Sequence, residues 1–202
     1  EVCDALFLPG ACIEISSLPG SGAHSMVLQL MRLALASSSS SSKWLGALEM
    51  DKEEGWGQLY APAVAASGIP LERLLVVRSP RVKIRKMAVR LSAQSFFAAL
   101  LIDFTSVRNL GEMSVAIRRL AMNARDFGCT TFLMTSLQAK RPRSLSVAVR
   151  AAIRPDRAPG TVKIEILRHR EGRLTPLVAN LPVFFWEELM FSSQQKSAPH
   201  HE

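Results

Sequence analysis

Two glycines, Gly20 and Gly22, lie between a predicted strand and a predicted helix, in the segment SLPGSGAH that begins at Ser17. Nucleotide-hydrolysing proteins place the pattern G-x-x-x-x-G-K-[ST] at such a junction, because the loop amides hold phosphates, the Lys neutralises them and the hydroxyl binds Mg²⁺. When Gly22 is aligned with the second glycine, Ser17 takes the first position, Ala23 the Lys position and His24 the hydroxyl position. The two residue types that would do the chemistry are therefore replaced.

These replacements argue against phosphoryl transfer. Alanine has no charge to place on a phosphate, and an imidazole is a poor ligand for the hard Mg²⁺ ion. A helix N-terminus with Gly20 and Gly22 could still hold an anion through backbone amides, as a minor alternative. For His24, no Ser/His/Asp arrangement is visible around it, so we favour a capping or surface role over catalysis.

Carboxylates follow two of the predicted strands. Asp103 ends the apolar run ALLID, where a strand-end Asp would hold the Mg²⁺ water in a nucleotide-hydrolysing protein, although such an Asp can equally cap a loop. Asp51, Glu53 and Glu54 follow the second strand, where a general base could activate water, but a solvated acidic loop is the simpler interpretation. We therefore predict no enzymatic activity, no cofactor and no metal site.

Composition and charge limit the number of domains, the kind of partner and the cellular location. The 202 residues are 48% hydrophobic, which is enough for one domain over residues 1–202 with a sizeable core. A formal net charge of +8 favours a polyanionic partner such as DNA about as much as it favours simple solubility. The three cysteines form no C-x-x-C pair, which fits a cytoplasmic protein, and no apolar run is long enough for a membrane span. The chain begins at Glu1 without an initiator Met, so we expect a preceding segment.

The order of elements predicts the fold class. Strands and helices alternate in five successive strand-then-helix units, which predicts an α/β fold with a mostly parallel central sheet and helices on both faces. Two later segments, SLSVAVRAAI and TVKIEILRHR, alternate apolar and polar residues around a Pro/Gly turn at 156–160. We expect them to form an antiparallel strand pair at one edge. The expected strands are 11–16, 44–50, 74–79, 98–104 and 130–135, and the expected helices are 24–36, 61–67, 81–96 and 112–127.

The same segments resemble RecA over about residues 8–170. ACIEISSLPGSGAHS resembles its phosphate loop, GIPLERLLVV the segment leading to its next strand, and LLIDFTSVRNL its metal-binding strand. RRLAMNARDFGCTTFLMTS resembles the helix and strand that normally end in an Asn-Gln sensor of ATP state, replaced here by Thr135 and Ser136. The resemblance implies a RecA-like core.

Within that superfamily, the chain resembles the ImuA family. The block LYAPAVAASGIPLERLLVVR is the most telling stretch, and VAVRAAIRP and EILRHREGR are similar to the end of the family's sequence. The family implies an accessory role in SOS-induced translesion synthesis and mutagenesis. The partners it implies are RecA, the polymerase-like ImuB, an error-prone replicative-type DNA polymerase and, through basic loops, DNA.

Three basic groups are candidates for DNA contact. The predicted helix 81–96 carries one, which we interpret as a solvated face because its charges are spread around the helix. The second follows the strand that ends near Ser136, where RecA has a DNA-contacting loop, and the third ends the last predicted strand. The candidate DNA-binding residues are Lys140, Arg141, Arg143, Arg168, Arg170 and Arg173. Because no row of aromatic residues accompanies them, stacking on single-stranded bases is not supported.

The segment 175–202 contains the cluster PVFFWEELMF, which is compatible with a helix. We expect this cluster to pack on its own domain; if exposed, it would suit a partner's groove. The candidate partner-binding residues are Phe184, Phe185, Trp186 and Phe191.

Three hypotheses follow. We favour an ATPase-deficient RecA-like adaptor, acting as a monomer or small oligomer. The alternatives are a SulA-like cell-division inhibitor, since that family is also a diverged RecA relative, and a nucleotide-binding recombinase-like ATPase. The last would need a distant Lys or Arg to replace Ala23.

Overall fold

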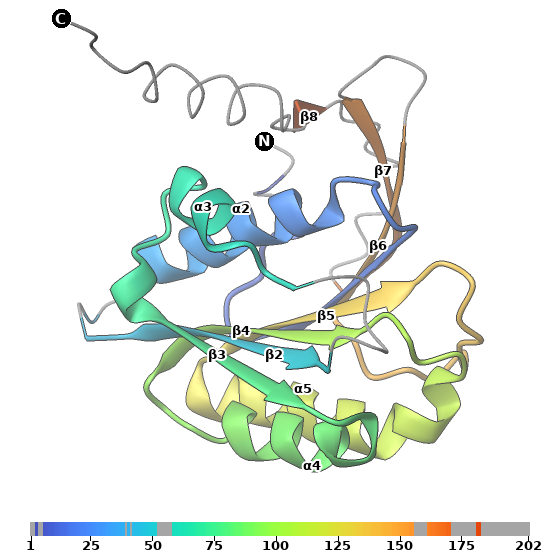
Figure 1. Cartoon of the computed structure of the whole chain (residues 1–202). Coiled ribbons are helices and arrows are strands. Elements are labelled where there is room, and N and C mark those ends of the chain that lie inside the picture. Colours follow the sequence, from blue (N-terminus) through green and yellow to red (C-terminus); the bar gives the residue numbers. More distant parts are fainter. Residues whose placement is uncertain are drawn as a thin grey trace, which may run out of the picture.

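One sheet organises the chain. The computed structural model describes residues 3, 6–38, 40, 42–51, 58–155, 161–170 and 181–182. Its eight strands run in the order β3-β2-β4-β5-β1-β6-β7-β8 (Figure 1). The first six strands in this order, from β3 to β6, run parallel to one another, whereas β7 is antiparallel to both β6 and β8. The strands are β1 (Cys12–Ser17), β2 (Trp44–Met50), β3 (Leu74–Ser79), β4 (Phe97–Phe104), β5 (Thr130–Ser136), β6 (Val149–Pro155), β7 (Thr161–His169) and β8 (Leu181–Pro182).

Helices cover both faces of the sheet. In Figure 1, α2 (Ala23–Ala36) and α3 (Ala61–Ala66) lie above it, and α4 (Arg81–Ser92) and α5 (Ser114–Phe127) lie below. Short 3₁₀ turns, Leu71–Arg73 and Leu110–Met113, lead into β3 and α5. The α/β architecture, with a mostly parallel sheet and an antiparallel strand pair at one edge, is the one that the sequence predicts.

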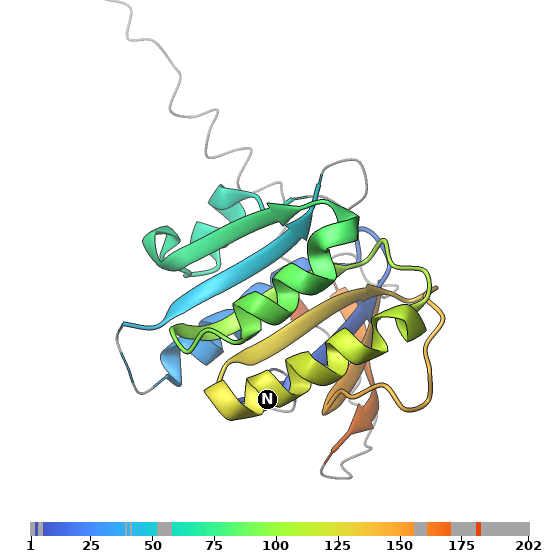
Figure 2. The same cartoon turned by 90° about the horizontal axis from the view of Figure 1, so that it is seen from below.

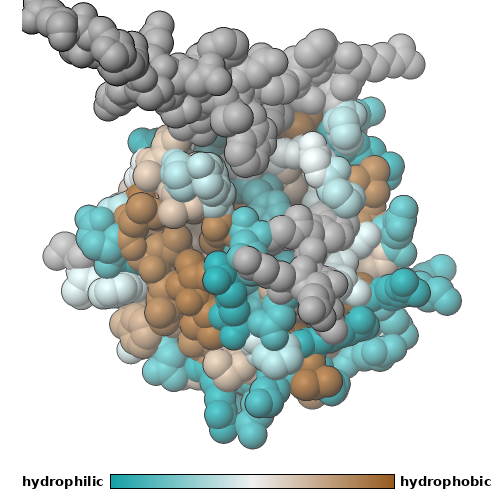
Figure 3. Space-filling view, viewed as in Figure 1, coloured by the Kyte–Doolittle hydropathy of each residue, from teal (hydrophilic) through white to brown (hydrophobic). Residues whose placement is uncertain are grey.

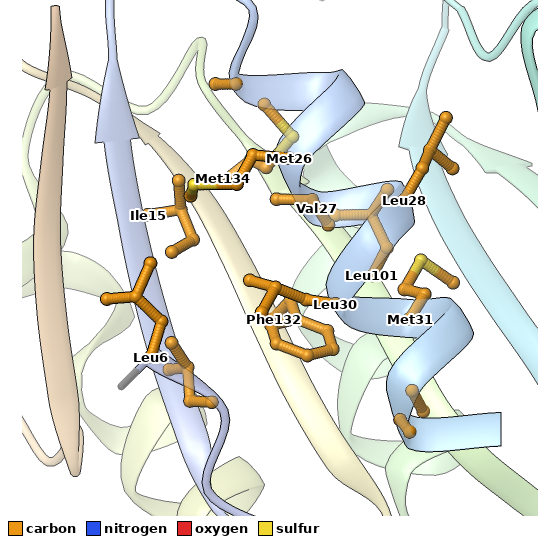
Figure 4. Close-up of a cluster of buried hydrophobic side chains, with 14 of the residues drawn as sticks. Leu6, Ile15, Met26, Val27, Leu28, Leu30, Met31, Leu101, Phe132 and Met134 are labelled. Carbon is orange, nitrogen blue, oxygen red and sulfur yellow. The ribbon is translucent and has the colours of Figure 1, made fainter. Parts of the chain in front are cut away.

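The upper layer is held by an almost wholly apolar helix. Met26, Val27, Leu30 and Met31 of α2 are at most 2% exposed, and they meet the sheet above Phe132 (Figure 4). These positions share the face of α2 that packs on the sheet, while Arg32 and Ala36 are exposed on the other side of the helix. Methionine fits here because its flexible thioether fills irregular gaps.

The two helices below the sheet, α4 and α5, are amphipathic. Helix α4 buries Ile84, Ala88 and Ser92, which are spaced four apart and so share one face, while its basic residues are exposed. Helix α5 packs beside α4 and ends at Gly128, whose φ of 66° is the left-handed conformation that glycine adopts without strain. The basic group of α4 is therefore a solvated face, as predicted.

The sequence overestimates the number of strand-helix units. Strand β5 is followed by the loop 137–148, which leads directly to β6, so the described chain has four such units instead of five. Leu145 and Val147 of this loop are buried in the lower core and fill space that a fifth helix would cover. Seen from below, α5 is the last of the described helices on this face, and β6 and β7 lie beyond it (Figure 2).

The position of β3 also differs from what its apolar sequence suggests. A continuous apolar run is typical of a central parallel strand, yet β3 is the edge of the sheet. Leu75 and Val76 are 39% and 38% exposed, and a hydrophobic area lies over this part of the surface (Figure 3). The predicted helix 81–96 is shorter than expected, because α4 ends at Ser92.

Candidate functional site

The loop 17–24, which we call the phosphate loop for its resemblance in sequence to one, joins β1 to α2 at the carboxyl edge of the parallel strands, where open α/β sheets place their ligands. Gly20 and Gly22 have φ values of 73° and 76°, so the turn needs glycine at both positions. Gly22 is the N-cap of α2 and provides no side-chain hydrogen bond to the first turn. The side-chain hydroxyls of Ser17 and Ser21 are buried and have no hydrogen-bond partner among the described residues.

The loop encloses a hollow of about 90 Å³ lined by residues 17–24. Pockets for drug-sized ligands are typically about 300–1,000 Å³, so this hollow alone suits a small anion or water. The uncapped amides of α2 and the two unpaired hydroxyls, from Ser17 and Ser21, are the groups available to such an anion.

The two replaced positions do not supply a cation. Ala23 is 3% exposed and belongs to the upper core. Burial lowers the pKa of His24 below its usual value, and the carboxylates of Asp103 and Glu49 raise it by less. His24 is therefore neutral at pH 7, so it cannot take over the charge of the missing Lys. It is half-buried beside two carboxylates, which corrects its interpretation as a surface residue.

Asp103 is 5% exposed and is engaged in its own turn. Its Oδ1 accepts hydrogen bonds from the backbone amide of Thr105 at 2.8 Å and from the Thr105 hydroxyl at 2.5 Å. This is the local capping arrangement that short acidic side chains make. The geometry favours the capping role over the metal-holding role.

A second carboxylate, Glu49 of β2, lies at the same edge and was not singled out from the sequence. Its Oε1 accepts the amide of Leu59 at 2.6 Å, and its Oε2 lies 3.5 Å from Nε of Arg78. Glu49 is 4% exposed, and its contact with Leu59 fixes the segment that leads to α3, whereas its contact with Arg78 joins β2 to β3. Asp51 is exposed, and Glu53 and Glu54 lie outside the described residues.

Arg141 proves to be structural, which corrects its assignment as a DNA-binding residue. Its Nε donates to Oε1 of Glu14 at 2.7 Å, and its remaining nitrogens donate to carbonyls of its own loop and to Thr135. Glu14 is fully buried in β1, and its other oxygen accepts from Nε of Arg150 at 2.7 Å. A buried carboxylate held by two guanidiniums thus anchors the loop after β5 to the middle of the sheet.

Beside the phosphate loop lies a groove of about 990 Å³, which we call the carboxyl-edge groove. It shares the wall formed by Leu18 and Pro19 with the smaller hollow. Its exposed cations are Arg81, Arg108 and Lys140, and none of the described residues that line it is acidic.

Two backbone hydrogen bonds hold two of these cations together. The amide of Lys140 donates to the carbonyl of Arg108 at 2.8 Å, and the amide of Leu110 donates to the carbonyl of Lys140 at 2.9 Å. The loops after β4 and β5 are therefore joined, and Arg141 fixes the second of them next to Lys140. The carboxyl-edge groove is a preformed cluster of positive charge suited to phosphate groups.

The other predicted residues lie elsewhere. Arg143 is exposed on the loop after β5 but does not line the carboxyl-edge groove. Arg168 and Arg170 lie at the end of β7, at the opposite edge of the sheet. One basic residue and the aromatic cluster lie outside the described residues: Arg173, Phe184, Phe185, Trp186 and Phe191.

Sequence reasoning missed Glu14, Arg150 and Arg108. The signal for Glu14 was a single charge inside the apolar strand CIEIS, because an ionised side chain is rarely buried without a partner. Arg108 had no such signal, since its importance depends on the pairing of two loops that are distant in sequence.

Within the ranges that the structure describes, no three His, Cys, Asp or Glu side chains gather closely enough to hold a metal ion. No described helix combines the length and apolar character needed to cross a membrane. No protein-family model matches the chain, and no curated protein sequence matches it significantly.

Proposed function

We propose that this chain is an ATPase-deficient RecA-like adaptor of the ImuA kind, which serves translesion DNA synthesis through protein partners. The observation that carries the proposal is the phosphate loop. It keeps the strand-turn-helix geometry but presents buried Ala23 and uncharged His24 where hydrolysis needs Lys and a hydroxyl. The arrangement of strands and helices is compatible with a RecA-like core. The partners in this proposal are RecA, ImuB and the error-prone polymerase.

We propose in addition that the carboxyl-edge groove binds the backbone of single-stranded DNA weakly. Arg81, Arg108 and Lys140 provide three exposed cations next to one another, without an acidic residue among the described lining. Three phosphate contacts on a single strand give a slope of about −2 for log K against log salt concentration. A weak, salt-sensitive interaction of this size suits an accessory factor that works beside other DNA-binding proteins.

The first test measures the fluorescence of an ATP analogue with Mg²⁺ at increasing concentrations of the full chain. We expect no saturable signal, because the loop supplies no positive side chain and its hollow is small. Inorganic phosphate should raise the Tm of the full chain only at high concentration, because only backbone amides would bind it. Tight Mg²⁺-dependent binding of ATP would refute the proposal and restore the ATPase alternative.

The second test measures single-stranded DNA binding by anisotropy at several salt concentrations. The double variant Arg108→Gln with Lys140→Gln should reduce the slope from about −2 to about −0.7, because one groove cation remains. The matched control, Lys83→Gln with Lys86→Gln, removes the same charge from the exposed face of α4 and should leave the slope unchanged. Equal losses in both variants would show that net charge, and not the groove, binds DNA.

The third test separates the adaptor from the SulA-like alternative. The full chain is immobilised, and purified RecA, ImuB, the polymerase and a tubulin-like division protein are passed over it at equal concentrations. Binding to one of the first three, without binding to the division protein, supports the adaptor. Selective binding to the division protein would refute it.

A further inference from the structure

A second groove, of about 690 Å³, lies at the opposite edge of the sheet, and we call it the amino-edge groove. It lies between α5 and the segment that precedes β6, beside the residues that lead into β1. Among the described elements, α5 is the last helix on the lower face, because β5 is followed by a loop, and β6 and β7 lie beyond it (Figure 2).

Four exposed arginines border this groove. Arg118 and Arg125 are seven residues apart on α5, so they project from the same face about 10 Å apart along the helix axis. Arg168 and Arg170 come from the end of β7. The groove therefore has cations from two separate elements.

Hydrogen bonds to backbone carbonyls hold one wall of the groove in place. Nη1 of Arg168 donates to the carbonyl of Leu145 at 2.9 Å, and the amide of Arg170 donates to the carbonyl of Ala148 at 2.8 Å. Of these four arginines, only Arg125 has a carboxylate partner among the described residues, Asp126 at 3.4 Å, and both side chains are more than half exposed. An exposed pair of this kind contributes little and is readily exchanged for another carboxylate.

The surface between the arginines is apolar. Leu8, Ala121, Met122 and Val147 are among the residues that line it, and Met122 is 37% exposed. An exposed Met on a helix is an adaptable contact for apolar side chains of a partner. A ligand that uses the whole groove must therefore carry negative charge and an apolar group together.

We propose that the amino-edge groove binds an acidic peptide segment of a partner protein, in which carboxylates flank apolar side chains. Arginine favours carboxylates because its guanidinium can make two parallel hydrogen bonds to one of them. Nucleic acid fits less well, because none of the described residues that line the groove is aromatic and could stack on a base, and a phosphate backbone would leave the apolar surface uncovered. The proposal goes beyond the function proposed above and does not depend on it.

The test uses a short fluorescein-labelled peptide with two Leu residues between pairs of Glu, titrated with the full chain. Two control peptides replace every Glu by Lys, or both Leu by Ser. We expect the first peptide to bind, the Lys peptide not to bind, and the Ser peptide to bind more weakly. Failure of the first peptide to bind, or equal binding of the first and the Ser peptide, would overturn the proposal.

Variants of the full chain locate the site. Arg118→Glu with Arg125→Glu should weaken peptide binding about tenfold or more, and Met122→Ser should weaken it about threefold. The control, Lys83→Glu with Lys86→Glu, makes the same change of charge on α4 and should leave affinity within about twofold. Circular dichroism melting shows that each variant is folded; if a double variant is not, Arg118→Gln replaces it with the same expected direction.

Two other occupants are outcomes of the same experiment. If single-stranded DNA displaces the peptide and loses affinity to the same extent in the Arg118/Arg125 variant, the groove binds nucleic acid. If sedimentation shows a dimer that this variant dissociates, the groove binds a second copy of the chain. Either result would overturn the proposal. Nucleotide and DNA binding by the same variants report on the phosphate loop and the carboxyl-edge groove. The peptide proposal and the proposed function can therefore fail separately.

Discussion

The buried carboxylate of Glu14 leads to a prediction about both stability and the position of the loop after β5. Glu14 is fully buried, and the side chains of Arg141 and Arg150 are 15% and 16% exposed. The substitution Glu14→Gln keeps the shape of the side chain but leaves two guanidiniums without a counter-charge. Its amide nitrogen would also face a donor nitrogen of one arginine.

Removing one partner of a buried ion pair costs about 3–5 kcal/mol. Because both guanidiniums keep some contact with water, we expect the lower end of that range, about 3 kcal/mol. For a chain of this size, each kcal/mol corresponds to roughly 2–4 °C in Tm, so Glu14→Gln should lower Tm by about 6–12 °C. The matched control is Glu72→Gln, an exposed residue of the turn before β3, which should leave Tm within about 2 °C.

A double-mutant cycle tests the cause. Arg141→Met removes one of the two guanidiniums but leaves Glu14 paired with Arg150, so it should cost about 2 kcal/mol. The free energy lost by the double variant should be smaller than the sum of the single losses by about 1 kcal/mol or more. Chemical denaturation followed by circular dichroism measures all four proteins. A fall in Tm of less than about 2 °C for Glu14→Gln, or additive losses, would refute this reasoning.

Three further predictions follow from the packing and burial of single residues. A Cβ at Gly46 would lie 2.6 Å from a leucine methyl carbon of β4, so Gly46→Ala should destabilise the protein by about 1–3 kcal/mol in urea unfolding. Burial raises the pKa of Cys12, and it raises that of Cys129 to about 12, so a thiol reagent at pH 8 should label half-buried Cys3 in the native protein and all three cysteines only in denaturant. Burial lowers the pKa of His24, so below about pH 6.5 the unfolded chain binds its proton more readily than the folded chain does. Stability should therefore decrease as pH falls through that range, and His24→Gln should remove part of the decrease; an imidazole NMR titration at or above 6.5 would contradict this prediction.

Periodicity and apolar runs were sufficient to predict most of the sheet. The run FAALLIDF is fully buried in the centre of the sheet, and the Gly that follows α5 ends that helix as predicted. The alternating segments form the antiparallel pair β6 and β7 because one face of each strand is buried. These features depend on residues that are close in sequence.

Features that depend on distant pairing were not predicted. The apolar run LLVVRS is compatible with a central or an edge strand, and only the strand order shows that β3 is at the edge. Arg141 lies in a basic run that resembles a solvated loop, and its burial becomes clear only when Glu14 is placed opposite. The same is true of Arg108 and Lys140, which two backbone hydrogen bonds bring together.

The glycines of the phosphate loop are explained by the fold alone. Gly20 and Gly22 both have positive φ, because the chain must turn sharply from β1 into α2. These glycines are needed for the fold whether or not a phosphate is bound, whereas Lys and Ser or Thr are needed only for phosphate and metal. The glycine pattern by itself is therefore no evidence of nucleotide hydrolysis.

A groove bordered by exposed basic residues lies at each end of strand β1. The carboxyl-edge groove has three exposed cations and the amino-edge groove has four. Strand β1 has six residues and runs from the second groove towards the first, a length of roughly 20 Å. At that separation, a DNA strand in one groove and an acidic peptide in the other would not collide. An adaptor needs two sites that can be occupied together. The proposals for the two grooves are therefore tested together by measuring the affinity for DNA with and without saturating peptide, and we expect no change.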